Sequence, residues 1–193
     1  MSLIPAFEIG VWNTWILMVT WVFFHMLPLD WPIFRYNIKA MMKKGSASPP
    51  YNRNEKILNN LGTIIWFALL IYSIFLPLPL GTPLLYAGIA LFVVGLVIFE
   101  IAGIPWAKTA IDEPIVTGLY RYSRHPIYVG VFIQYLGMGI ASASGLFLLL
   151  IVISITLSIL VIPAEERFCL EKYGDTYRKY MNNTPRWMGI PKS

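Results

Sequence analysis

The sequence predicts an all-α integral membrane protein with five transmembrane helices, the last two forming a helical hairpin, followed by a cytoplasmic C-terminal helix. Two observations predict this fold class. Hydrophobic residues make up 57% of the 193 positions and charged residues only 13%, whereas soluble domains carry about 25% charged residues. Three long intervals, 9–29, 57–99 and 126–164, also contain no Asp, Glu, Lys or Arg.

The lengths of these intervals set the number of crossings. A spanning helix needs roughly 20 apolar residues, so the first interval fits one crossing and each of the others fits a hairpin. The Pro-rich segment 77–83 and the Ser/Gly segment 142–145 supply the turns. The expected spans are 9–29, 57–76, 83–103, 127–141 and 146–163.

The fourth span is short. Its length is about 22 Å at the usual helical rise, against a hydrocarbon core of roughly 30 Å. Either this helix extends into neighbouring residues, or the hairpin lies low in the membrane and leaves a cavity on the cytoplasmic side. After the fifth span, residues 165–180 are expected to form an amphipathic cytoplasmic helix.

The basic residues orient the chain. When the spans alternate in direction, all fifteen Lys and Arg residues fall on one face, in 30–56, 104–125 and 164–193. This is a strong positive-inside pattern. We therefore expect an integral protein of the cell membrane or inner membrane, with its N-terminus on the outer side and its C-terminus in the cytoplasm. The net charge of +5 then reflects topology and contact with anionic lipid, rather than nucleic-acid binding.

A polar segment, Gly118–Tyr128 (GLYRYSRHPIY), precedes the fourth span. Pro126 suits the first turn of a helix, where a missing N–H costs nothing. Arg124 and His125 would then stand just before a helix N-terminus, which attracts anions such as a carboxylate or a phosphate. The alternative is that these side chains anchor the helix among lipid headgroups, and residue types alone favour that anchor.

Glu165 and Glu166 follow the last apolar interval, on the basic side of the membrane. A carboxylate at this depth can accept hydrogen bonds from ribose hydroxyls or hold a cationic group. A salt bridge to Arg121, Arg124 or Arg167 explains the pair equally well.

Glu100 ends the third span and is either a functional group within the membrane or an interfacial residue, because Pro105 and Trp106 follow closely. With two histidines and one cysteine, Cys169, the sequence predicts no metal site and excludes an internal disulfide.

Several short motifs in residues 112–186 stand in a specific order and spacing. They are Val116-Thr117-Gly118-Leu119-Tyr120, Arg124-His125-Pro126-Ile127-Tyr128, Glu165-Glu166, Tyr173-Gly174-Asp175-Thr176-Tyr177, Tyr180, Pro185 and Arg186. With these motifs, this part of the chain resembles the integral-membrane methyltransferases of the isoprenylcysteine carboxyl methyltransferase and phospholipid methyltransferase group, whereas the first hundred residues share only the apolar spans.

The resemblance implies a cytoplasm-facing S-adenosylmethionine pocket at about 104–186, within a single membrane-embedded domain that covers residues 1–193. Arg124, at the expected helix start, would hold the methionine carboxylate. The other cofactor contacts that the resemblance implies are Pro114, Ile115, Val116, Tyr120, His125, Pro126, Ile127, Tyr128 and Glu165.

The implied activity is methyl transfer from S-adenosylmethionine to a lipophilic or membrane-dissolved small substrate with an amine, thiol, hydroxyl or carboxylate nucleophile. Val161 stands where the carboxyl methyltransferases carry an arginine four residues before the first glutamate, which disfavours a carboxylate. The candidate proton acceptors are Glu100, His125 and Glu166. The alternatives are an NADPH-dependent membrane reductase related to sterol reductases, or a non-enzymatic transporter or assembly protein.

Overall fold

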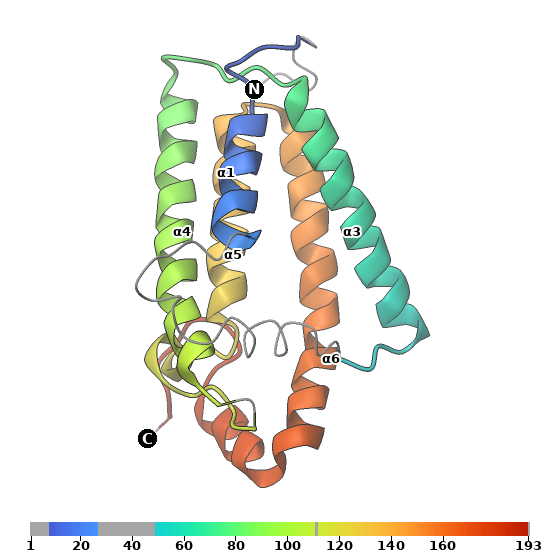
Figure 1. The fold of residues 1–193 in the computed structure, drawn as a ribbon, viewed down its shortest axis with the longest axis vertical. Coiled ribbons are helices and arrows are strands. Elements are labelled where there is room, and N and C mark those ends of the chain that lie inside the picture. The colour runs from blue at the N-terminus through green and yellow to red at the C-terminus, as the bar shows by residue number, and fades with distance from the viewer. Residues whose placement is uncertain (1–7, 27–48, 111, 193) are drawn as a thin grey trace.

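The structure is a computed structural model that describes residues 8–26, 49–110 and 112–192 (Figure 1). These residues contain no β-strand, only an isolated bridge between Asn13 and Pro77, so the predicted all-α class is confirmed. The elements in chain order are α1 (Trp15–Met26), α3 (Arg53–Ile74), α4 (Pro83–Lys108), the 3-10 turn η1 (Gly118–Arg121), α5 (Pro126–Ala141) and α6 (Gly145–Asn183).

Three of the helices, α3, α4 and α6, are long and apolar enough to cross a membrane, while α1 and α5 are shorter apolar helices. Of the 18 consecutive residues of α3 that are most apolar, only 11% are buried within the protein. This part of α3 therefore exposes apolar side chains on most of its surface, as expected of a helix that faces lipid.

The predicted start of the first span is wrong, because α1 begins at Trp15 rather than at residue 9. The two residues before α1 are held by hydrogen bonds to the end of α3 and to the turn that follows it. The N–H of Thr14 donates to the carbonyl of Leu76 at 2.8 Å, and the amide of Asn13 donates to the carbonyl of Ile74 at 2.7 Å. The predicted end of this span, 27–29, lies outside the described residues.

Other helix ends also differ from the predicted spans. Helix α3 begins four residues early because Asn52 and Glu55 form a reciprocal capping box at its N-terminus. Helix α4 continues to Lys108, past Pro105 in its last turn. Helix α6 runs without interruption through the predicted boundary at 163 and bends instead at Gly174, where φ is 54°.

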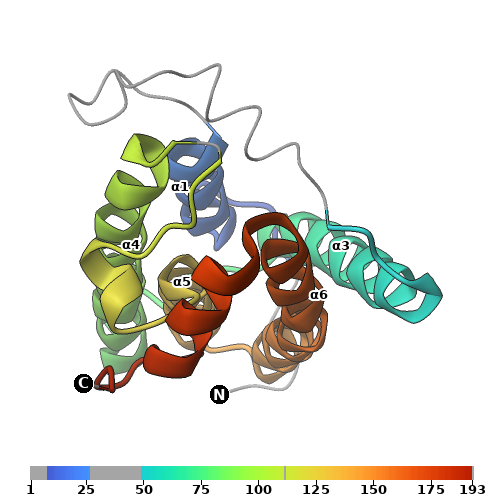
Figure 2. The ribbon, with the colours of Figure 1, turned by 90° about the horizontal axis from the view of Figure 1, so that it is seen from below.

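The described helices stand side by side, with their polar termini gathered at the lower end of Figure 1. We call this the charged end: it holds the first turn of α3, the last turn of α4, η1, the start of α5 and the C-terminal part of α6. The two hairpin turns and the first described residues lie at the opposite end. Seen from below, α5 lies between α4 and α6, and α3 lies on the outer side of α6 (Figure 2).

Helices α4 and α5 pack with their backbones in direct contact. A Cβ atom added to Gly95 would lie 2.6 Å from the carbonyl oxygen of Gly130, and one added to Gly130 would lie 2.7 Å from the backbone nitrogen of Phe99. Only glycine permits so close an approach. This contact fixes α5 along α4 and thereby sets the position of its first turn at the charged end.

Candidate functional site

The segment that leads into α5 is held between the end of α4 and the C-terminal part of α6. Gly118 has φ 61°, a left-handed conformation that favours glycine, and a Cβ there would lie 2.8 Å from the Pro105 side chain. Tyr120 is buried, and its carbonyl accepts a 2.7 Å hydrogen bond from the hydroxyl of Tyr180. Burial raises the pKa of the Tyr120 phenol far above its ordinary value, so this side chain stays neutral.

Helix α5 begins as predicted, with Pro126 as its first residue and His125 as its N-cap, and no side chain caps it. The hydroxyl of Ser123 accepts from the backbone N–H of His125 at 3.0 Å and donates to the carbonyl of Arg186 at 3.2 Å. The C-terminal segment therefore fixes the turn before α5. The first-turn N–H groups of α5 remain available to an anionic group.

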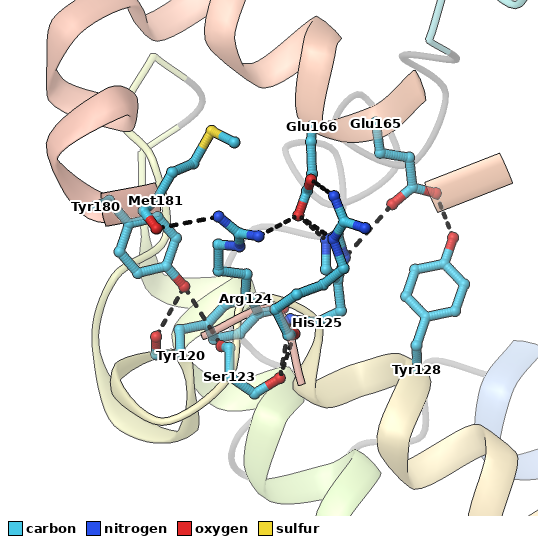
Figure 3. Close-up of polar contacts among 10 residues, drawn as sticks. Tyr120, Ser123, Arg124, His125, Tyr128, Glu165, Glu166, Tyr180 and Met181 are labelled. Atoms are coloured by element: carbon cyan, nitrogen blue, oxygen red, sulfur yellow. Dashed lines mark hydrogen bonds and ion pairs between the residues drawn. The ribbon is translucent and has the colours of Figure 1, made fainter. Parts of the chain in front are cut away.

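Glu166 lies at the centre of a cationic cluster (Figure 3). Its Oε1 is 3.1 Å from an Nη of Arg124 and 3.1 Å from Nε2 of His125. Arg186 donates through Nε to Oε1 at 3.1 Å and through an Nη to Oε2 at 2.5 Å. Glu166 is only 4% exposed, and a buried carboxylate needs such partners to remain ionised. Its hydrogen bonds also raise the pKa of Arg186.

Glu165 points to a different neighbour. Its Oε1 accepts a short hydrogen bond from the hydroxyl of Tyr128, and its Oε2 is 4.0 Å from Nδ1 of His125. The His125 ring therefore stands between the two glutamates, with Nε2 toward Glu166 and Nδ1 toward Glu165, as Figure 3 shows. This arrangement joins α5 to α6 at the charged end.

Two nitrogens of the Arg124 guanidinium contact protein groups. In addition to its contact with Glu166, it donates to the carbonyl of Met181 at 3.1 Å. Its Nε is buried without a hydrogen-bond partner. A buried unpaired donor is costly, so this N–H is a candidate donor to a further acceptor.

The structure brings together five of the sequence-predicted residues in one place: Arg124, His125, Tyr128, Glu165 and Glu166. The salt-bridge alternative is correct for Glu166, which pairs with Arg124. It is not correct for Glu165, which has no arginine partner among the described residues. Arg167 pairs with Glu55 instead, at 2.8 Å.

Other predicted residues lie elsewhere. Glu100 is in α4 and has no hydrogen bond or ion pair with any other described residue. Pro114, Ile115 and Val116 lie in the non-helical segment before η1 and are partly or largely exposed.

Sequence reasoning did not assign a site role to Ser123, Tyr180 or Arg186. Tyr180 and Arg186 are among the residues that carry the family resemblance, so the sequence did indicate that they matter. Their partners, however, lie about sixty and twenty residues away in the sequence, and no spacing rule predicts which groups meet.

Comparison with known proteins identifies the family of the chain. Residues 78–176, about half of the chain, match the model of a family described as phospholipid methyltransferase. The chain is also similar to a protein-S-isoprenylcysteine O-methyltransferase from Schizosaccharomyces pombe, with 35% identity over 85 residues. The aligned part covers 42% of this chain and 34% of that relative, so the similarity spans about a third of the relative's length. The match to the family model includes η1, all of α5 and the Glu165-Glu166 pair. This match shows that the chain belongs to the phospholipid methyltransferase family of integral membrane proteins.

Proposed function

We propose that the protein is an S-adenosylmethionine-dependent methyltransferase that acts on a lipophilic small substrate dissolved in the membrane. Family membership supports methyl transfer. The observation that carries the cofactor assignment is the start of α5, where an uncapped helix N-terminus, the unpaired Arg124 Nε and the Glu165 carboxylate lie together at one end of the bundle.

These groups suit a zwitterionic cofactor. The helix N-terminus and Arg124 offer N–H donors for the methionine carboxylate, and Glu165 offers an acceptor for a ribose hydroxyl or for the amino group. Backbone of the segment before η1 and of the first turn of α5 would line the remainder, at Pro114, Ile115, Val116, Tyr120, His125, Pro126, Ile127 and Tyr128. When bound, the cofactor supplies an electrophilic methyl group on sulfonium.

The chain's own residues then orient the acceptor, exclude water and receive a proton. Of the three candidate proton acceptors, we favour His125. Glu166 is occupied by two arginines and the imidazole, and Glu100 is not part of the cluster. His125 has only a 4.0 Å contact at Nδ1, so this nitrogen is the more accessible.

We further propose the membrane arrangement. The charged end lies in the cytoplasm with the C-terminal part of α6, and the opposite end with the described N-terminal residues lies outside. In this arrangement all five helices cross or enter the bilayer as one domain covering residues 1–193, with the cofactor region at about 104–186. The gathering of basic segments at one end supports this orientation.

Calorimetric titration of the detergent-solubilised protein with S-adenosylhomocysteine, and separately with NADPH, tests the function. We expect saturable binding of S-adenosylhomocysteine that weakens at least about tenfold, or 1.4 kcal/mol, in Glu165→Gln. Glu171→Gln makes the same change at an exposed position on the same helix and should leave the affinity unchanged. Binding of NADPH without S-adenosylhomocysteine would contradict the proposal and favour a reductase.

A further inference from the structure

A cavity of about 470 Å³ lies between α1, α3, α5 and α6. Its volume falls within the roughly 300–1,000 Å³ of small-molecule sites. Helix α3 supplies much of its outer wall, and in Figure 1 this helix diverges from the bundle toward its N-terminal end. The cavity therefore lies between α3 and the rest of the bundle.

The lining is apolar and uncharged. None of the described residues that line the cavity is Asp, Glu, Lys, Arg or His, and seven of them are aromatic. Its polar groups are neutral. Thr63 and Ser158 donate their hydroxyls to carbonyls of their own helices, each at 3.0 Å. The side-chain amide of Asn59 has no hydrogen-bond partner among the described residues.

One end of the cavity reaches the candidate site. Ile127 and Tyr128, in the first turn of α5, line the cavity, and the Tyr128 hydroxyl donates to Glu165. Val161 also lines it, one turn before Glu165 on α6. Tyr51 lines the same cavity; burial, and then the negative charges of Glu165 and Glu55, raise the pKa of its phenol. The acid Glu165 therefore lies at this end of the cavity.

An ion pair holds the outer wall in place at the charged end. Arg167 donates to both carboxylate oxygens of Glu55, each at 2.8 Å. This pair ties the first turn of α3 to α6 and also neutralises Glu55. Neither charge lines the cavity, so the cavity keeps its neutral interior.

We propose that this cavity binds the methyl acceptor, and that the acceptor is a lipophile whose nucleophilic end is a hydroxyl or an amine presented to Tyr128, not a carboxylate. This inference rests on the proposed function and specifies the substrate class of the same site.

The reason is the cost of desolvation. An ionised carboxylate in an apolar cavity is strongly unfavourable unless a cation pairs with it, and the described lining supplies none. At the end where the carboxylate would have to react, the Tyr128 hydroxyl is bonded to the acid Glu165, which supplies no positive charge. A hydroxyl or an amine, in contrast, can donate a hydrogen bond to Glu165 or to the Tyr128 oxygen, and the aromatic walls favour its apolar body.

Photolabelling of the full chain in lipid nanodiscs tests this assignment. Three probes carry the same diazirine-bearing alkyl chain and end in an amine, a hydroxyl or a carboxylate. Labelled peptides are mapped by mass spectrometry, and labelling of the cavity is normalised to labelling of the outward-facing residues Val93 and Val97 on α4, which are about half exposed. We expect the amine and hydroxyl probes to label the cavity about tenfold more than the carboxylate, as 1.4 kcal/mol of selectivity requires.

A charge placed in the lining should change this order. Asn59→Lys should raise carboxylate labelling and lower amine labelling, whereas Asn59→Asp should do the reverse, so that one variant suffices if the other does not fold. Asn60→Lys is the matched control, because Asn60 is an exposed neighbour on α3 that does not line the cavity.

Equal normalised labelling by the three probes, or labelling confined to the outward-facing residues, would overturn the inference. Binding of S-adenosylhomocysteine is measured on the same samples. If it persists without selective labelling, only the inference fails. If the cavity is labelled selectively but S-adenosylhomocysteine does not bind, the proposed function fails, and with it the assignment of the cavity to a methyl acceptor.

Discussion

Tyr128 in the first turn of α5 donates its hydroxyl to Glu165 on α6, 37 residues away in sequence. The same tyrosine lines the cavity between α1, α3, α5 and α6, while Glu165 faces His125. This hydrogen bond therefore connects the apolar cavity to the cationic cluster around Glu166. In the proposed enzyme, the acceptor and the cofactor would meet at this pair.

Tyr128→Phe should lower methyl transfer and cofactor affinity together. The change removes the donor to Glu165 but keeps the ring that lines the cavity. Because hydrogen bonds to charged groups contribute about 1.5–3 kcal/mol, we expect S-adenosylhomocysteine affinity to fall by at least about tenfold. Tyr122→Phe, at a half-exposed tyrosine, is the control. Unchanged affinity in Tyr128→Phe would show that Glu165 does not depend on this bond.

Glu166→Gln should destabilise the protein rather than only impair binding. The substitution leaves the buried Arg124 guanidinium and Arg186 without their counter-charge. Breaking a buried ion pair by removing one partner costs about 3–5 kcal/mol, and the partial exposure of Arg186 places the expected loss near about 3 kcal/mol. Thermal unfolding in detergent measures it, with Glu171→Gln as the exposed control. An unfolding temperature equal to that of the unchanged protein would mean that the cluster does not stabilise the fold.

Gly130→Ala should weaken the packing of α4 against α5. The added methyl group would meet the Phe99 backbone nitrogen at 2.7 Å and the Gly95 carbonyl at 2.9 Å, and these backbone atoms of α4 cannot yield as a side chain would. Overpacking typically costs about 1–3 kcal/mol. Gly103→Ala, where nothing lies within 4 Å of the new methyl group, should instead stabilise α4 by about 0.5–1 kcal/mol. Thermal unfolding of the two variants should therefore show opposite signs.

Single cysteines introduced on a Cys169→Ala background should report opposite sides of the membrane. Leu80, in the turn before α4, and Asp175, beyond the bend in α6, are both well exposed. We expect an impermeant maleimide applied to intact cells to label Leu80→Cys and not Asp175→Cys. Labelling of both positions from the same side would contradict the proposed arrangement of spans.

Much of the fold could be predicted from residue types. The charge-free intervals located the apolar helices, because uncharged stretches of this length are stable within lipid, and Pro126 marked the start of α5. Helix ends were less accurate. The start of α1 depends on bonds from Asn13 and Thr14 to the turn after α3, and the start of α3 depends on the Asn52–Glu55 capping box.

The sequence by itself determined that charged groups gather at one end of an apolar bundle and that Glu165 and Glu166 belong to that end. Only the tertiary structure decided what each of them contacts. Successive residues on a helix point about 100° apart, so Glu165, Glu166 and Arg167 reach three different segments. They contact Tyr128, the cationic cluster and Glu55, respectively. Because those partners come from α5 and the turn before it, from the C-terminal segment and from α3, their choice depends on how the helices pack and not on the local spacing of residues.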